Sequence, residues 1–177
     1  FQSSPCGNDT VKIFIKDYNV LTGSFDNPVI CGTGADILDF NSAYGFPPIT
    51  YQWNTGETTS SINTSTNVST NYIITVTDAC GTSITDSVFV DIIDATLSKN
   101  DILCFGQQNG NATVNVNIGT APYNYNWNTT PQQNGVTATG LAAGDYSVTI
   151  TDAHNCSLEI PFSITQPPQL ALNLMSQ

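Results

Sequence analysis

The sequence contains no arginine, and its three lysines are set against 14 acidic residues, for a net charge of −11. Because phosphate contacts depend on basic patches, this balance excludes nucleic acid and acidic phospholipid surfaces as partners. No run approaches 18 apolar residues and no charged, then apolar, leader opens the chain. We therefore expect neither a membrane span nor a signal peptide in this segment, and any export address lies outside it.

Charged residues make up only 10% of the chain, and Asn, Thr, Ser and Gln carry most of the polarity. No window has the period of an amphipathic helix, whereas many have the two-residue period of a strand. Such a composition is typical of exposed β-sheet faces outside the cell. The alternation predicts inward rows at Ile49, Tyr51 and Trp53, at Tyr72, Ile74 and Val76, at Val88, Val90 and Ile92, at Ala112, Val114, Val116 and Ile118, at Tyr146, Val148 and Ile150, and at Leu158, Ile160, Phe162 and Ile164.

One order of residues occurs twice: Cys31, Trp53, Tyr72 and Cys80, and then Cys104, Trp127, Tyr146 and Cys156. The Cys-to-Trp separations are 22 and 23, the Trp-to-Tyr separation is 19 in both copies, and the Tyr-to-Cys separations are 8 and 10. Spacing kept over so long a stretch indicates tandem copies of one small module. Short strands between frequent turns predict an all-β fold of tandem immunoglobulin-like sandwiches in a linear array.

The repeat predicts an organisation into modules at 21–94 and 95–168. Residues 1–20 match the last strand of a preceding, truncated module, with a strand at 10–18, and 169–177 match a linker or the start of a following one. We therefore expect the chain to be a window of a longer array. Pro161 places the final strand of the second module at a sheet edge, since proline cannot donate to a ladder.

The five cysteines allow pairing within modules or across module junctions. If the first strand of a sandwich starts at the pole where the penultimate strand ends, Cys31 should pair with Cys80 and Cys104 with Cys156. Pairing across a junction would have to bridge a whole strand, far beyond the Cα separation of about 7 Å that a disulfide tolerates. Cys6 would then remain unpaired in this window.

Few residues offer catalytic or metal chemistry. His154 is the one histidine and fits a surface turn, and Glu57 and Glu159 belong to different modules, so a triad or a glycosidase pair is not expected. A site of reduced cysteines lacks any CxxC pair. Asp78 and Asp152 end equivalent strands and are weak calcium candidates, with turn capping as the favoured role. We expect no enzyme and no cofactor.

Trp53 and Trp127 could form a sugar-stacking platform together with neighbouring tyrosines. Because they share a face with the aliphatic rows, we expect them in the core instead. Tyr72 and Tyr146 have the spacing of a tyrosine corner.

The stretch from Cys104 through Trp127 and Tyr146 to Cys156 resembles the SprB repeat family of flavobacterial gliding-motility adhesins. The first module, from Trp53 to Asp78, is similar to PKD-like domains but lacks the acidic residue that usually precedes their glycine. This resemblance implies export by the type IX pathway and a bacterial cell-surface filament of stacked modules.

Two triplets, ending at Val11 and Val88, resemble a bacteroidete O-glycosylation motif and make Thr10 and Ser87 candidate glycosylation sites just before the final strand of their modules. In the alternative interpretation, the aspartate of each triplet fixes a turn.

The leading hypothesis is an extracellular spacer that projects a binding tip and adheres weakly through many copies, with neighbouring repeats, surface polysaccharide or substratum as partners. One alternative is a carbohydrate-binding module of a secreted hydrolase, for which an exposed row of aromatics would be the sign. Another is the protomer of a strand-donating surface polymer, as an orphan strand at 10–18 would suggest.

Overall fold

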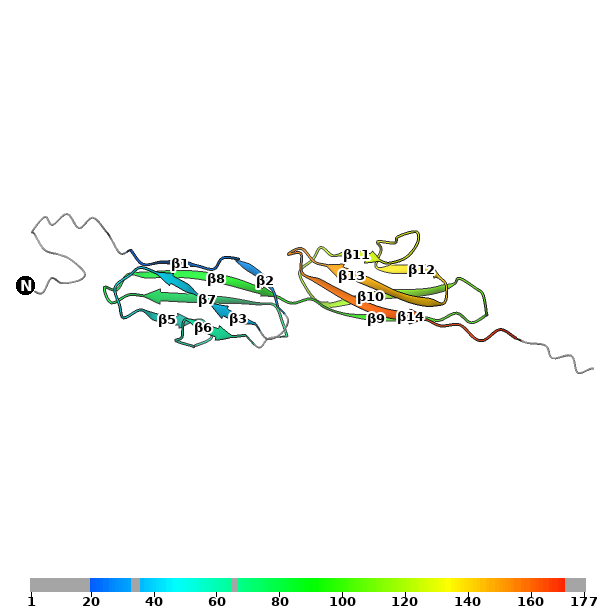
Figure 1. Ribbon diagram of the computed structural model, residues 1–177, viewed down its shortest axis with the longest axis horizontal. Coiled ribbons are helices and arrows are strands. Elements are labelled where there is room, and N and C mark those ends of the chain that lie inside the picture. The colour runs from blue at the N-terminus through cyan, green and yellow to red at the C-terminus, as the bar shows by residue number, and fades with distance from the viewer. Residues whose placement is uncertain (1–19, 33–35, 65–66, 171–177) are drawn as a thin grey trace, which may run out of the picture. The chain divides into compact units, whose positions relative to one another are not determined.

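The computed structural model describes residues 20–32, 36–64 and 67–170 (Figure 1). The predicted strand at 10–18, Cys6 and Thr10 lie outside these residues. The chain divides into two compact units, Phe1–Asp91 and Ile92–Gln177, a boundary three residues before the predicted module end at 94. The described residues form fourteen strands and no helix, and hence no helix that could cross a membrane.

The first unit packs two β layers against one core. One layer is a four-stranded sheet in which β2 runs parallel to β8 and the other neighbours are antiparallel, in the order β2 (Val29–Cys31), β8 (Ser83–Asp91), β7 (Thr70–Thr77) and β5 (Thr50–Trp53). The other layer consists of two short antiparallel pairs, β1 (Thr22–Ser24) with β4 (Asn41–Ala43) and β3 (Ile37–Asp39) with β6 (Ser61–Asn63). This is an immunoglobulin-like sandwich.

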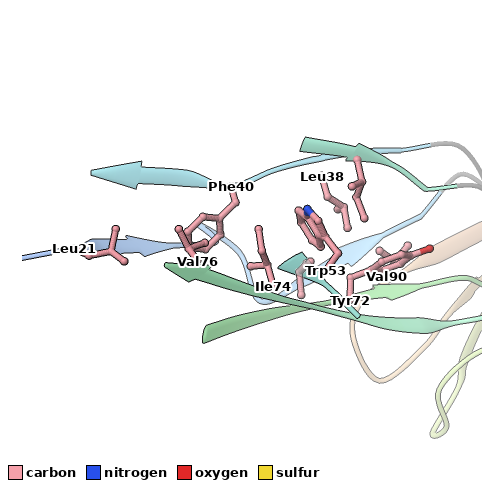
Figure 2. Close-up of a cluster of buried hydrophobic side chains, with 10 residues drawn as sticks. Leu21, Leu38, Phe40, Trp53, Tyr72, Ile74, Val76 and Val90 are labelled. Carbon is pink, nitrogen blue, oxygen red and sulfur yellow. The ribbon is translucent and has the colours of Figure 1, made fainter. Parts of the chain in front are cut away.

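The core of the first unit follows the predicted alternation. Tyr72, Ile74 and Val76 on β7 and Val88 and Val90 on β8 are all buried. Figure 2 shows the side chains of Trp53, Phe40 and Leu38 gathered with this row between the layers. Ile92, predicted to continue the β8 row, lies beyond the strand and belongs to the second unit.

The second unit is a sandwich of two three-stranded antiparallel sheets. Their orders are β12 (Thr137–Leu141), β10 (Gly110–Ile118) and β9 (Asp94–Asn100), and β11 (Asn124–Trp127), β13 (Gly144–Thr151) and β14 (Ser157–Ile164). Pro161 lies on the edge strand β14, as predicted. The sequence did not predict β9 or β12.

The core of the second unit repeats the pattern of the first. Val148 and Ile150 on β13 face Ala112 and Val114 on β10, and all four are buried around Trp127. The prediction of an all-β, immunoglobulin-like fold is therefore confirmed for each unit.

Candidate functional site

The turn after β7 is organised by Asp78, whose residue is only 6% exposed. Its Oδ1 accepts the backbone N–H groups of Cys80 and Thr82, each at 2.9 Å, and its Oδ2 accepts that of Phe46 at 3.3 Å. Burial raises the pKa of this carboxyl group, but hydrogen bonds from the backbone of Thr82, Phe46, Cys80 and Gly81 outweigh it, so the pKa lies below its ordinary value.

Asp152 makes the same turn after β13. Its Oδ1 accepts the N–H groups of His154 and Cys156 at 2.9 Å, and its Oδ2 accepts that of Thr120 at 3.4 Å. With three backbone donors on each carboxylate, the geometry assigns Asp78 and Asp152 a turn-capping role. Calcium binding, the less favoured of the two roles that the sequence suggested for Asp78 and Asp152, is untested.

The cysteines do not pair as predicted. Cys104 is a free, exposed thiol, whereas Cys31, Cys80 and Cys156 are disulfide-bonded. The predicted bond between Cys104 and Cys156 is therefore wrong.

The directions of the strands explain this error. The N–H of Ala153 donates to the carbonyl of Thr120 at 2.9 Å, so the turn that carries Cys156 lies beside the end of β10. Cys104 precedes the start of β10, a strand of nine residues. At about 3.3 Å per residue the two cysteines lie at opposite poles, roughly 25 Å or more apart, far beyond disulfide reach.

Cys31 and Cys80 also lie too far apart to form a disulfide bond with each other. Cys31 pairs in register with Asp91 at the end of β8, whereas Cys80 lies just before Ser83, where β8 begins. The nine residues of β8 again hold the two sulfur atoms at opposite poles of the unit.

Ser87, the described glycosylation candidate, lies in the middle of β8 opposite Ile73, and not before the final strand as expected. Asp86 of the same triplet accepts the backbone N–H of Phe25 at 2.7 Å and that of Ser87 at 2.8 Å. The aspartate thus ties the segment after β1 to β8. Glycosylation of Ser87 stays a prediction.

Both tryptophans are core residues, as predicted. Trp53 is 1% exposed and Trp127 is fully buried, so neither can offer a stacking face to a sugar. Their indole N–H groups donate to backbone carbonyls in the loop that follows, of Thr59 and Gly135, each at 2.8 Å. Each tryptophan therefore fixes the loop after its strand as well as filling the core.

The asparagine after each tryptophan has a structural role that the sequence did not predict. Asn54 exchanges two hydrogen bonds with the backbone of Ile73, using its own N–H and its side-chain oxygen. Asn128 does the same with Ser147, at 3.1 and 2.9 Å. The amide thus prolongs the strand pairing by one residue. The repeated Trp-Asn-Thr triplet was the available signal.

The three residues considered for catalysis are all exposed. His154 lies in the Asp152 turn, Glu57 lies in the first unit and Glu159 lies on β14 of the second. The backbone of His154 serves the Asp152 cap, which agrees with the surface-turn interpretation.

The outer face of the β12–β10–β9 sheet carries mainly neutral hydrogen-bonding groups, together with the carboxylate of Asp94 at the start of β9. Asn100 donates to Asn111 at 2.9 Å, and the hydroxyl groups of Thr113 and Thr137 lie 2.9 Å apart. Asn117 donates to Asp94, also at 2.9 Å. This face therefore offers amides and hydroxyls to solvent with very little charge.

A hollow of about 310 Å³ lies in the second unit. It is lined by residues of the β11–β12 loop and of β12, together with Gln108 and Tyr146, and none of its nine lining residues is charged. The Tyr146 hydroxyl donates to the carbonyl of Ala142, four residues upstream, at 3.2 Å, as in the predicted tyrosine corner. The hollow therefore has a polar, uncharged and partly rigid wall.

Comparison with known protein families finds one match, within the second unit. Residues 96–131 match the model of the SprB repeat, a stretch that includes most of β9 and all of β10 and β11. None of the curated proteins compared with the chain is similar enough in sequence to count as a relative.

Several solved structures resemble the chain. A C-terminal 282-residue fragment of intimin, solved with the intimin-binding domain of its translocated receptor, has a TM-score of 0.52 and 10% identity over 81% of this chain and 62% of the fragment. The N-terminal eight Ig domains of Down syndrome cell adhesion molecule have a TM-score of 0.47 and 12% identity, over 82% and 27%. An amphioxus IgVJ-C2 molecule has a TM-score of 0.36 and 15% identity, over 77% and 99%. At this identity the intimin likeness establishes the fold alone.

Proposed function

We propose that this chain, whose second unit carries a SprB-type immunoglobulin-like module, is a structural and adhesive repeat segment of an extracellular cell-surface protein. The match of residues 96–131 to the SprB repeat, within a complete sandwich, carries the proposal. In finer terms, the chain belongs to a secreted bacterial filament of the gliding-motility adhesin type, exported by the type IX pathway. Its modules space a binding tip from the cell and catalyse no reaction.

The construction of each unit supports a spacer role. A buried tryptophan fixes the loop after its strand, a buried aspartate caps the closing turn, and an asparagine prolongs the strand pairing. Because these contacts recur at matching places in both units, they belong to the module and not to a particular ligand site. They favour a stiff, protease-resistant sandwich.

The adhesive part of the proposal is supported by the mainly neutral outer face of the β12–β10–β9 sheet. Amides and hydroxyls can exchange hydrogen bonds with a polysaccharide or a hydrated substratum, each exchange contributing little net free energy. Many copies on one surface would raise the total attachment by orders of magnitude through avidity. The intimin fragment, solved with a receptor domain, is a precedent for a sandwich fold in a binding protein.

Microspheres that carry the full chain at graded densities test this function. Under flow over a polysaccharide-coated surface, we expect the attached fraction to rise more steeply than in proportion to density, because attachment is multivalent. The chain in free solution should compete poorly with the microspheres for the surface, because it binds with few copies at a time. Microspheres that carry an unrelated immunoglobulin-like sandwich of similar net charge are the control, and attachment no better than theirs at every density would refute the proposal.

A further inference from the structure

We infer that the hollow beside β12 is a binding site for a neutral saccharide residue of a polysaccharide chain. This inference deepens the adhesive function proposed above and rests on it for the class of ligand. At about 310 Å³ the hollow lies near the lower end of the range of small-ligand pockets. A site of this size suits one sugar unit of a longer chain.

The chemistry of the wall selects a neutral ligand. Because none of the nine lining residues is charged, a charged group in the hollow would lose hydration without gaining an ionic partner. Threonine hydroxyls and glutamine amides lie next to the apolar surfaces of Pro131, Leu141 and Tyr146. A sugar ring matches this mixture, since its hydroxyl groups form hydrogen bonds while its C–H faces pack on apolar surface.

The wall is held in place before any ligand arrives. The Gln133 amide donates to the carbonyl of Thr139 at 2.9 Å and accepts its N–H at 3.0 Å. The Thr129 hydroxyl donates to the carbonyl of Pro131 at 2.8 Å and accepts the N–H of Gln133 at 3.1 Å. The ring of Tyr146 stacks on Phe162, with centroids 5.7 Å apart. A preformed wall of this kind lowers the entropic cost of binding.

Other groups in the hollow are available to a ligand. In the described part of the chain, the side chains of Gln108 and Thr130 form no hydrogen bond with the protein. Gly140 lines the hollow with φ at +69°, and a Cβ built on it would approach only the carbonyl oxygen of Gln108, at 3.9 Å. Because Gly140 and Gln108 both line the hollow, we expect a side chain at Gly140 to narrow it.

Affinity electrophoresis of the full chain through gels that contain dextran, mannan or arabinogalactan tests the site. We expect at least one of these neutral polysaccharides to retard the chain and Gly140→Asn to weaken its association constant about tenfold or more. Asparagine tolerates a positive φ, so the variant should fold. Gly106→Asn is the matched control, because Gly106 also has a positive φ, at +76°, and open space around its Cβ. It should bind within about twofold of the unmodified chain.

A second variant keeps the test independent of the backbone at Gly140. Gln108→Ala combined with Thr130→Ala removes the two available side chains and should also weaken binding, with Trp127 fluorescence as the check of folding.

Three outcomes would overturn the inference. They are retardation by none of the neutral polysaccharides, retardation only by acidic alginate or hyaluronate, and unchanged binding of both variants. If microspheres of the Gly140→Asn variant still attach, the adhesive function stands without this site. If unmodified microspheres fail to attach while the gel shift persists, the site stands without the adhesive function.

Discussion

Asp152 and Cys156 are joined by two hydrogen bonds: the N–H of Asp152 donates to the carbonyl of Cys156 at 3.0 Å, and the N–H of Cys156 donates to Asp152 Oδ1 at 2.9 Å. Both residues are buried. In the first unit, Asp78 makes the corresponding two bonds with Thr82. Cys156 therefore corresponds to Thr82, and Cys80 corresponds to His154. The difference of two in the Tyr-to-Cys spacing places the two cysteines on different sides of the same turn.

Asp152→Ala should destabilise the second unit by about 2 to 3 kcal/mol, because it leaves buried N–H donors without an acceptor. Asp152→Asn keeps one acceptor oxygen and should lose about half as much. Urea unfolding followed by Trp127 fluorescence, in a Trp53→Phe background, reports on this unit. Asp145→Ala removes an exposed carboxylate bonded to Ser163 and is the control; equal losses for Asp145→Ala and Asp152→Ala would contradict the capping role.

Asp78 should make the first unit sensitive to acid. Its folded pKa is lowered, so its contribution is fully present above the ordinary value of about 3.9 and is lost as the pH falls through the lower, folded pKa. Trp53 fluorescence during acid titration, in a Trp127→Phe background, measures the loss. Asp78→Asn should be less stable near neutral pH and should lose less on acidification below about pH 4. If the stability of Asp78→Asn changed with pH in parallel with that of the unmodified chain, the assignment of this acid sensitivity to Asp78 would be contradicted.

Thiol chemistry distinguishes the cysteines. In the folded, unreduced chain, maleimide should label Cys104 and leave Cys31, Cys80 and Cys156 unmodified until a reductant is added. Peptide mapping by mass spectrometry locates the label. Cys104→Ser should change stability by less than about 0.5 kcal/mol, as for other exposed sites. A disulfide-linked peptide that joins Cys104 to Cys156 would contradict the strand directions described here.

Calcium should not stabilise either unit through Asp78 or Asp152, because backbone donors already occupy these carboxylates. At a free calcium concentration one hundred times the dissociation constant, a bound ion would raise the free energy of unfolding by about 2.7 kcal/mol. A change of this size is readily measured. We therefore expect the same melting temperature for each unit with millimolar calcium and with a chelator. A rise with calcium that Asp78→Asn or Asp152→Asn abolishes would establish the site.

The sequence was sufficient to predict the sandwich and its inward rows, because two-residue alternation reports directly which side of a strand is buried. Ile74 and Ile150 are buried as that pattern requires. The strand β9 was missed because only Ala95 and Leu97 mark its inner face before Lys99. The prediction of the disulfide pairing failed because pairing depends on the direction of whole strands. The alternation of apolar and polar residues does not report this direction. The hollow beside β12 could not be predicted from the sequence, because it forms only when tertiary packing brings Gln108 close to Gly140.

Antibody fragments raised against the folded chain test the central claim most directly, when they are applied to intact, unpermeabilised cells that produce it. The account predicts that monovalent Fab fragments label the cell surface and reduce attachment of the cells to a polysaccharide-coated substratum, whereas Fab fragments against an unrelated surface protein leave attachment unchanged. Absence of labelling until the cells are permeabilised, or surface labelling with no effect on attachment at saturating Fab, would contradict a role as an adhesive repeat.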